Sequence, residues 1–308
     1  MLRYIGRRLL QMIPVFFGAT LLIYALVFLM PGDPVQALGG DRGLSEAARA
    51  RIEAEYNLDK PFIVQYLLYL KGILTLDFGT TFSGQPVADV MARAFPVTIK
   101  LAVMALIFEA FFGIIFGVIA GVRRGGIFDS TVLVMSLIVI AVPSFVIGFV
   151  LQFVVGVKWG ILPVTVGSRE TFTSLLMPAI VLGAVSFAYV LRLTRQSVSE
   201  NLRADYVRTA RAKGLRKSAA VRKHSLRTAL VPMATYFAFV IAGLFTGATI
   251  TEQIFGWHGM GIYSVMSITG HDINGTVAVV AFSAAMTFFG LMLADIFTVV
   301  VDPRVRVS

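Results

Sequence analysis

Residues 131–157 read TVLVMSLIVIAVPSFVIGFVLQFVVGV and contain no charged side chain. About 20 apolar residues in an α-helix cross the hydrocarbon core of a bilayer, where the helix satisfies its own backbone hydrogen bonds. The stretch therefore predicts a membrane-spanning helix. The composition of the whole chain agrees, because 57% of its 308 residues are hydrophobic and only 14% are charged. A soluble globular protein does not have this composition.

Six apolar stretches of this kind predict an all-α integral membrane protein with six transmembrane helices. The predicted spans are residues 9–30, 97–120, 131–157, 175–191, 233–251 and 276–301. Pro178 and Gly183 interrupt the fourth span, which membrane helices tolerate. The N-terminus has the basic start of a signal peptide. Its apolar run is roughly twice a typical signal core and no small-residue cleavage site follows it, so we interpret it as a retained first span.

The distribution of Lys and Arg predicts the orientation of these spans. With the N-terminus inside, the segments between spans on the cytoplasmic side hold 18 of the 27 Lys and Arg residues. Cytoplasmic loops of membrane proteins carry such an excess. We therefore predict that both termini are cytoplasmic, together with the loop 192–231.

The predicted organisation has four parts. Residues 1–30 form the cytoplasmic end and first span, residues 31–96 an extracytoplasmic loop, residues 97–302 a core of five spans, and residues 303–308 a cytoplasmic tail. Within the loop we predict an amphipathic helix over 44–56, with Ser45 as its N-cap. A second, apolar helix is predicted to start at Pro61. It is too short to span and is expected at the outer interface or packed on the spans.

Several kinds of chemistry are absent from the sequence. There is no cysteine, which excludes disulfides, thiolate metal sites and cysteine nucleophiles. No Gly-Lys dipeptide occurs, so the chain has no P-loop for ATP. The three histidines, His224, His258 and His271, have no metal-site spacing. We predict no catalytic residue, no metal and no cofactor on this chain, and no nucleic-acid partner, because no recognition motif is present.

Two ionisable residues lie inside predicted spans, Glu109 midway in the second and Asp295 toward the inner end of the sixth. Such residues are candidates for a functional role in a membrane protein. They support one alternative function, an ion-coupled secondary transporter or channel. The other interpretation is structural, with each acid satisfied by polar neighbours inside the bundle.

The densest positive charge lies at residues 205–232, DYVRTARAKGLRKSAAVRKHSLRTALVP. We predict a helix over 199–213, ended by Gly214 as a C-cap, and a second helix over 217–229. The charge alone is consistent with membrane orientation, with binding of anionic lipid, or with docking of another protein. A membrane anchor that recruits lipid or a regulator is thus a third possible function.

The segment YVRTARAKGL, followed by RKHSLRTALVP, resembles the cytoplasmic EAA loop of permease subunits in ATP-binding-cassette importers. The general pattern has Glu-Ala-Ala, then three residues, then Gly. Aligned on Gly214, this chain has Arg208, Thr209 and Ala210 at those positions. The missing Glu, and the longer distance from Gly214 to Pro232, both resemble the dipeptide and oligopeptide branch of the family.

Four further segments resemble the same branch, in the same order along the chain. They are MPGDPV at 30–35, NLDKPFIVQYLLYLKGILTLDFGTTF at 57–82, EQIFGWHGMG at 252–261 and DPRVR at 302–306. His258 stands where the branch is expected to have Pro. The resemblance therefore covers essentially the whole chain.

This resemblance implies the type I importer permease fold, with a short coupling helix that sits in a cleft on an ATPase subunit. The residues implied to form the coupling site are Asp205, Tyr206, Arg208, Thr209, Ala210, Arg211, Ala212, Lys213, Gly214 and Leu215. The implied function is import of di- or oligopeptides across the bacterial plasma membrane. No pattern identifies the residues that bind substrate or distinguishes a peptide from haem, nickel or another solute, because the binding protein sets much of the selectivity.

The resemblance also implies the partners. They are a second, homologous permease subunit, one or two ATPase subunits that bind ATP-Mg and dock on the loop 192–231, an extracytoplasmic solute-binding protein, and membrane lipids.

Overall fold

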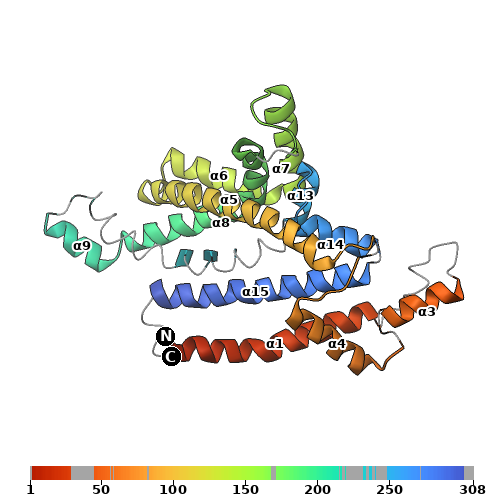
Figure 1. Ribbon diagram of the computed structural model, residues 1–308. Coiled ribbons are helices and arrows are strands. Elements are labelled where there is room, and N and C mark those ends of the chain that lie inside the picture. Colours follow the sequence, from red (N-terminus) through yellow and green to blue (C-terminus); the bar gives the residue numbers. More distant parts are fainter. Residues whose placement is uncertain are drawn as a thin grey trace. The chain divides into compact units, whose positions relative to one another are not determined.

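The computed structural model describes residues 2–28, 45–55, 57, 59–81, 83–167, 171–214, 216, 219, 232–233, 236–237, 240, 248–270 and 272–301. Over these residues the regular structure is helical, apart from one isolated β-bridge between Thr80 and Pro86. The prediction of an all-α protein is therefore confirmed. The helices, shown in Figure 1, are α1 Leu2–Phe28, α3 Glu46–Glu55, α4 Phe62–Thr75, α5 Val87–Val122, α6 Ile127–Ala141, α7 Ser144–Leu151, the π-helix η2 Gln152–Lys158, α8 Phe172–Asn201, α9 Asp205–Ala212, α13 Thr249–Phe255, α14 Met260–Thr269 and α15 Ile273–Val301.

Three helices among the described residues are long and apolar enough to cross a membrane. They are α5, α8 and the 274–293 part of α15. A bent pair, α6 with the helical segment 144–158, is a fourth span if it is counted as one. The predicted fifth span, 233–251, lies mostly outside the described residues. The count of six spans therefore stays a prediction.

The predicted third span, 131–157, is not a single helix. α6 ends at Ala141, and the helical segment that starts at Ser144 is bent from it by 104°. Proline explains the break, because Pro143 has no backbone N–H and its ring forces the residue before it out of the helical region. Val142 accordingly has an extended backbone, with φ −87° and ψ 126°. The prediction of one continuous span was wrong at this point.

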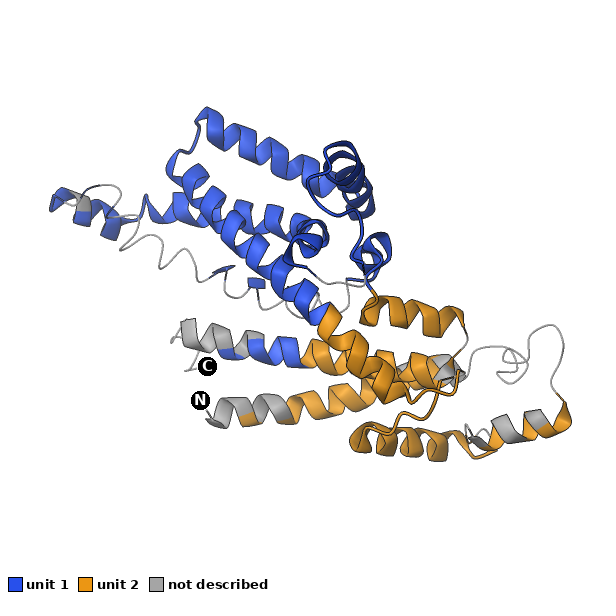
Figure 2. Cartoon of the chain, turned by 45° about the horizontal axis from the view of Figure 1, so that its top comes forward, with its two compact units in different colours: residues 1, 98–257, 289–308 blue, residues 2–97, 258–288 orange. Residues whose placement is uncertain are grey.

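The chain divides into two compact units, coloured in Figure 2. Unit 1 comprises residues 1, 98–257 and 289–308, and unit 2 comprises residues 2–97 and 258–288. Helices α5 and α15 each contribute residues to both units.

Unit 2 contains the outer-loop helices that the sequence predicts. α3 lies within the predicted 44–56, and α4 starts directly after Pro61, so both predictions are confirmed. α4 packs on α1, because the Tyr66 hydroxyl lies 2.9 Å from the Phe17 carbonyl and 3.0 Å from the Thr20 hydroxyl. Burial is the main cause that raises the pKa of Tyr69, and the neighbouring Tyr66 adds to it.

Unit 1 is organised around α8, which packs against α6, α7 and α13. On its C-terminal half α8 also approaches α5 closely, because three glycines of α5 face it. A Cβ atom on Gly113 would lie 2.7 Å from a methyl carbon of Val190, and one on Gly117 would lie 2.6 Å from the Leu191 carbonyl oxygen. A Cβ on Gly121 would lie 2.8 Å from the Arg195 carbonyl oxygen. Small residues of this kind allow membrane helices to pack backbone against backbone.

The segment after the bend is held by one buried amide. Gln152 starts η2, and its Nε2 donates to the Val164 carbonyl at 2.9 Å and to the Ile254 carbonyl at 2.8 Å. One side chain thereby satisfies backbone acceptors from the loop after η2 and from α13. A buried polar group requires such partners.

Candidate functional site

The predicted coupling helix is α9, which follows α8 after a short turn (Figure 1). The sequence predicts one helix over 199–213, and this prediction was wrong, because α8 ends at Asn201 and α9 begins at Asp205. The Asn201 side chain donates to the Ser197 carbonyl at 2.8 Å and accepts from the Tyr206 hydroxyl at 2.5 Å. An Asn side chain that bonds to local backbone competes with helix continuation. No Gly or Pro marks this break in the sequence.

α9 presents most of its side chains to its surroundings. Asp205, Tyr206, Arg208 and Thr209 are exposed, whereas Val207 is fully buried. The helix is therefore anchored by an apolar residue and offers a polar surface. Arg208 and Asp205 approach to 3.6 Å, but with side chains 77% and 96% exposed this ion pair contributes little to stability.

The C-terminal end of α9 agrees with the predicted cap. Ala212, Lys213 and Gly214 are exposed, and Ala210 is partly buried. Gly214 has φ +90°, a conformation that glycine adopts at little cost, so the predicted C-cap position is confirmed. The side chain of Arg211, the residue Leu215 and the predicted second helix 217–229, apart from residue 219, lie outside the described residues.

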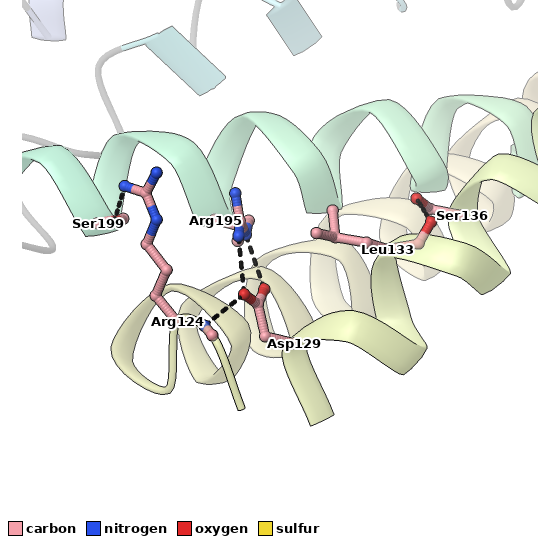
Figure 3. Close-up of polar contacts among 7 residues, drawn as sticks. Arg124, Asp129, Leu133, Ser136, Arg195 and Ser199 are labelled. Atoms are coloured by element: carbon pink, nitrogen blue, oxygen red, sulfur yellow. Dashed lines mark hydrogen bonds and ion pairs between the residues drawn. The ribbon is translucent and has the colours of Figure 1, made fainter. Parts of the chain in front are cut away.

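A second polar cluster ties α8 to the start of α6, and Figure 3 shows it. The Arg195 guanidinium binds the Asp129 carboxylate in bidentate fashion, with Nε to Oδ1 and Nη2 to Oδ2 both at 2.7 Å. The backbone N–H of Gly125 also donates to Oδ2 at 2.9 Å. Beside this pair, Arg124 donates to the Ser199 hydroxyl at 2.8 Å. We call the four side chains of Arg124, Asp129, Arg195 and Ser199 the clasp.

The Arg195–Asp129 pair of the clasp is much more protected from water than the ion pair on α9. The Asp129 side chain is 3% exposed and that of Arg195 is 19% exposed. A buried carboxylate is strongly destabilising if its partner is removed, so the pair fixes the geometry of the two helices. Its two parallel hydrogen bonds also restrict the relative orientation of α6 and α8.

The sequence does not predict the clasp. Asp129 and Arg195 are separated by 66 positions, and neither belongs to a motif. An Asp in the first turn of a helix is common because it favours the helix dipole, so Asp129 carries no functional signal by itself. The one available signal is that Asp129 is the sole acid in the short segment 121–130, which also holds Arg123 and Arg124.

Of the two ionisable candidates inside spans, Glu109 is fully buried in α5. Among the described residues neither of its carboxyl oxygens has a well-aligned hydrogen bond, but the Ser186 hydroxyl lies close enough to interact with the carboxyl group. Asp295 lies in α15, and its side chain is outside what the structure describes. A further buried acid that the sequence does not single out, Glu252 of α13, accepts a hydrogen bond from Thr98 at 2.6 Å. Over the described part of the chain, no three His, Asp or Glu side chains converge as a metal site requires.

Comparison with known proteins gives full-length matches. Residues 113–307 match the family described as the binding-protein-dependent transport system inner membrane component, and residues 1–102 match the N-terminal part of such membrane components. The chain is 36% identical to the dipeptide transport system permease protein DppB of Escherichia coli K12, over 99% of both chains. It is also 36% identical to the di/tripeptide permease DppB of Pseudomonas aeruginosa, over 99% of both. Identity to the oligopeptide permease OppB of Mycobacterium tuberculosis H37Rv is 34%, over the whole of both chains.

Proposed function

The chain belongs to the family of binding-protein-dependent transport system inner membrane components, and we propose that it is the permease subunit of an ATP-driven importer of di- and oligopeptides. The observation that carries the proposal is full-length similarity to three permeases named for dipeptides, di/tripeptides and oligopeptides. These relatives are transport components, not enzymes. The protein is accordingly a multi-pass protein of the inner membrane.

The energy source in this proposal is a separate ATPase subunit that binds ATP-Mg. The chain has no P-loop of its own. α9 supports the proposal, because it is short, polar on its exposed surface and anchored by the buried Val207. A helix of this kind suits insertion into a cleft of a partner. We assign α9 as the coupling helix, which places the loop 192–231 and both termini in the cytoplasm.

The transport cycle then follows from alternating access. A solute-binding protein delivers peptide to the extracytoplasmic face, where the chain and a second permease subunit form the pathway. ATP binding brings the two ATPase subunits together and displaces α9. Because only residues 202–204 separate α9 from α8, this displacement acts directly on the inner end of a helix long enough to span the membrane.

The ion-coupled alternative depends on Glu109 and Asp295. Glu109 is buried in α5, and the Ser186 hydroxyl is a polar group that interacts with its carboxyl group, which is compatible with a coupling group and with a structural acid. The full-length similarity to peptide permeases favours the ATP-driven function over this alternative.

The experiment is affinity purification of the chain in mild detergent, followed by reconstitution of the recovered complex in liposomes. We expect a second permease, an ATPase and a solute-binding protein to co-purify, and peptide uptake to require ATP. The Arg208→Glu variant should lose the ATPase and the uptake, because its reversed charge lies on the exposed surface of α9. The matched control is Arg123→Glu, an arginine that is also exposed but lies outside α9, which should retain both.

Two outcomes contradict the proposal. Recovery of the chain without an ATPase contradicts it, and so does peptide uptake by the purified chain alone along an ion gradient. The second outcome would favour the ion-coupled carrier, and replacement of Glu109 by Gln would then abolish uptake.

A further inference from the structure

We propose that the clasp of Arg124, Asp129, Arg195 and Ser199 is a rigid joint that stays closed during transport and transmits the displacement of α9 from α8 to α6. Arg195 and Asp129 are positioning residues in this proposal, because they act through the helices α8 and α6 that they join. The inference rests on the proposed function, in which an ATPase moves α9.

The first step concerns α8 itself. It has 30 residues and is therefore about 45 Å long. The ATPase would act on it through α9, which is attached at one end after Asn201. A helix displaced at its end can tilt or bend without moving its neighbours, unless contacts near that end tie it to them. The position of such contacts therefore decides what moves with α9.

The second step concerns the contacts near that end. Arg195 and Ser199 lie in the last two turns of α8, which places the clasp next to the turn that leads to α9. Ser199 is buried, at 3% exposure, and Arg124 reaches it from the turn that follows α5. The close approach of Gly117 and Gly121 to α8 continues the same contact toward the middle of the membrane. The inner end of α8 is thus fixed to its neighbours by polar and by backbone contacts.

The third step concerns what lies beyond the clasp. Asp129 is in the first turn of α6, so the bidentate pair holds the start of that helix. α6 leads to the bend at Pro143, and α7 after the bend packs on α8 and α13. A displacement that enters α6 at Asp129 is therefore passed to the segment after the bend. Without the clasp, only the packing of α6 on α8 would carry the displacement to α6.

A purely stabilising ion pair makes a different prediction. Its loss lowers the amount of assembled complex and the melting temperature, but each surviving complex still imports the same amount of peptide per ATP. A transmitting joint predicts that the ratio of uptake to ATP hydrolysis falls in complexes that have assembled. This ratio is the readout that separates the two roles.

The test uses the complete complex in liposomes. In the Asp129→Asn and Arg195→Gln variants we expect uptake per ATP to fall between about twofold and about thirtyfold, the range found for residues that couple two sites. Uptake per ATP should fall less in Arg195→Lys than in Arg195→Gln, because lysine keeps the positive charge, although it loses the bidentate geometry of the guanidinium. The matched control is Glu53→Gln, which breaks the exposed ion pair with Arg49 on α3 and should leave the ratio unchanged.

A cross-linking experiment tests whether the joint stays closed. The chain contains no cysteine, so Asp129→Cys with Arg195→Cys provides the sole thiol pair on this subunit. A short bifunctional thiol reagent suits the span of an Arg–Asp pair better than a disulfide, which needs closely spaced backbones. The double variant should be uncoupled before treatment and should recover uptake per ATP after it. Each single cysteine variant, treated in the same way, should not recover.

Each outcome decides the proposal. Recovery after cross-linking supports a joint that stays closed. Loss of uptake after cross-linking overturns it, because the clasp would then have to open in the cycle. A normal ratio in Asp129→Asn and Arg195→Gln also overturns it, even when those variants are less stable. If these variants fail to assemble, the same ratio is measured for Arg195→Lys. ATP-independent behaviour of the unaltered complex would instead contradict the proposed function.

Discussion

Replacing Gly117 by alanine should push α8 away from α5 and open the clasp. A Cβ atom at this position would lie 2.5 Å from Thr194 Cβ and 2.6 Å from the Leu191 carbonyl oxygen. Ordinary contact begins at 3.4 Å, so the closer of the two distances is about 0.9 Å too short. The Leu191 oxygen is a backbone atom, and Thr194 Cβ is bonded directly to the backbone. No side-chain rotation relieves the clash, and α8 has to move.

The cost of this clash follows from the size of the displacement. Overpacking a well-packed contact costs about 1–3 kcal/mol. Alanine also has a higher helix propensity than glycine by about 1 kcal/mol, which offsets part of that cost. A control variant removes this second effect. Gly18 lies inside α1 with no atom within 4 Å of an added Cβ, so Gly18→Ala gains the propensity without the clash.

The clasp should respond to the same displacement. Arg124, which lies just beyond the end of α5, donates to the Ser199 hydroxyl of α8 at 2.8 Å. A displacement of α8 away from α5 by about 0.9 Å lengthens this contact beyond the ~3.2 Å limit of a good hydrogen bond. Gly117→Ala should therefore reduce uptake per ATP as well as stability, whereas Gly18→Ala should lower neither quantity.

The assay compares thermal unfolding of the two variants in detergent, together with uptake per ATP in liposomes. We expect Gly117→Ala to be less stable than Gly18→Ala by about 1–3 kcal/mol, which corresponds to roughly 2–4 °C in melting temperature for each kcal/mol. Equal melting temperatures for the two variants would refute the reasoning about the glycine contact. If Gly117→Ala lowers stability but leaves uptake per ATP unchanged, the connection between the glycine contact and the clasp is refuted.

Three further variants test other parts of the structure. At Gly214, whose φ is +90°, alanine should cost about 1–2 kcal/mol and lower uptake per ATP, whereas asparagine should be tolerated better; equal losses would show that the left-handed cap is not needed. Gln152→Leu should lower the melting temperature by leaving the carbonyls of Val164 and Ile254 without their donor, at about 1–3 kcal/mol for each, and an unchanged melting temperature would contradict this role. Tyr66→Phe should detach α4 from α1 and make the outer loop more sensitive to added protease, with a loss of about 1 kcal/mol; an unaltered cleavage rate would count against that packing.

Much of the fold could be predicted from local sequence. The apolar stretches predict long helices, Pro61 marks the start of α4, and Gly214 marks the end of α9. Each of these features depends on residues that are neighbours in the chain. The apolar run 131–157 shows the limit of such reasoning. Its composition predicts one continuous span, yet Pro143 divides the run by a bend of 104°.

The candidate site was predictable only in part. Its place in the chain follows from the resemblance of residues 206–215 to a coupling loop, and α9 does form there. Its geometry does not follow, because the break after Asn201 depends on side-chain hydrogen bonds and not on a helix breaker. The clasp could not be predicted, since Asp129 and Arg195 are 66 positions apart in the chain.

The sequence by itself determined that this protein is helical, embedded in a membrane and without a P-loop. The tertiary structure alone decided that α8 is joined to α6 through Asp129 and Arg195, and that three glycines of α5 bring that helix close to α8. The physical reason is the range of the interactions. Helix formation and membrane insertion depend on residues close together in the chain, whereas an ion pair between helices requires a rotation and a register that only packing establishes.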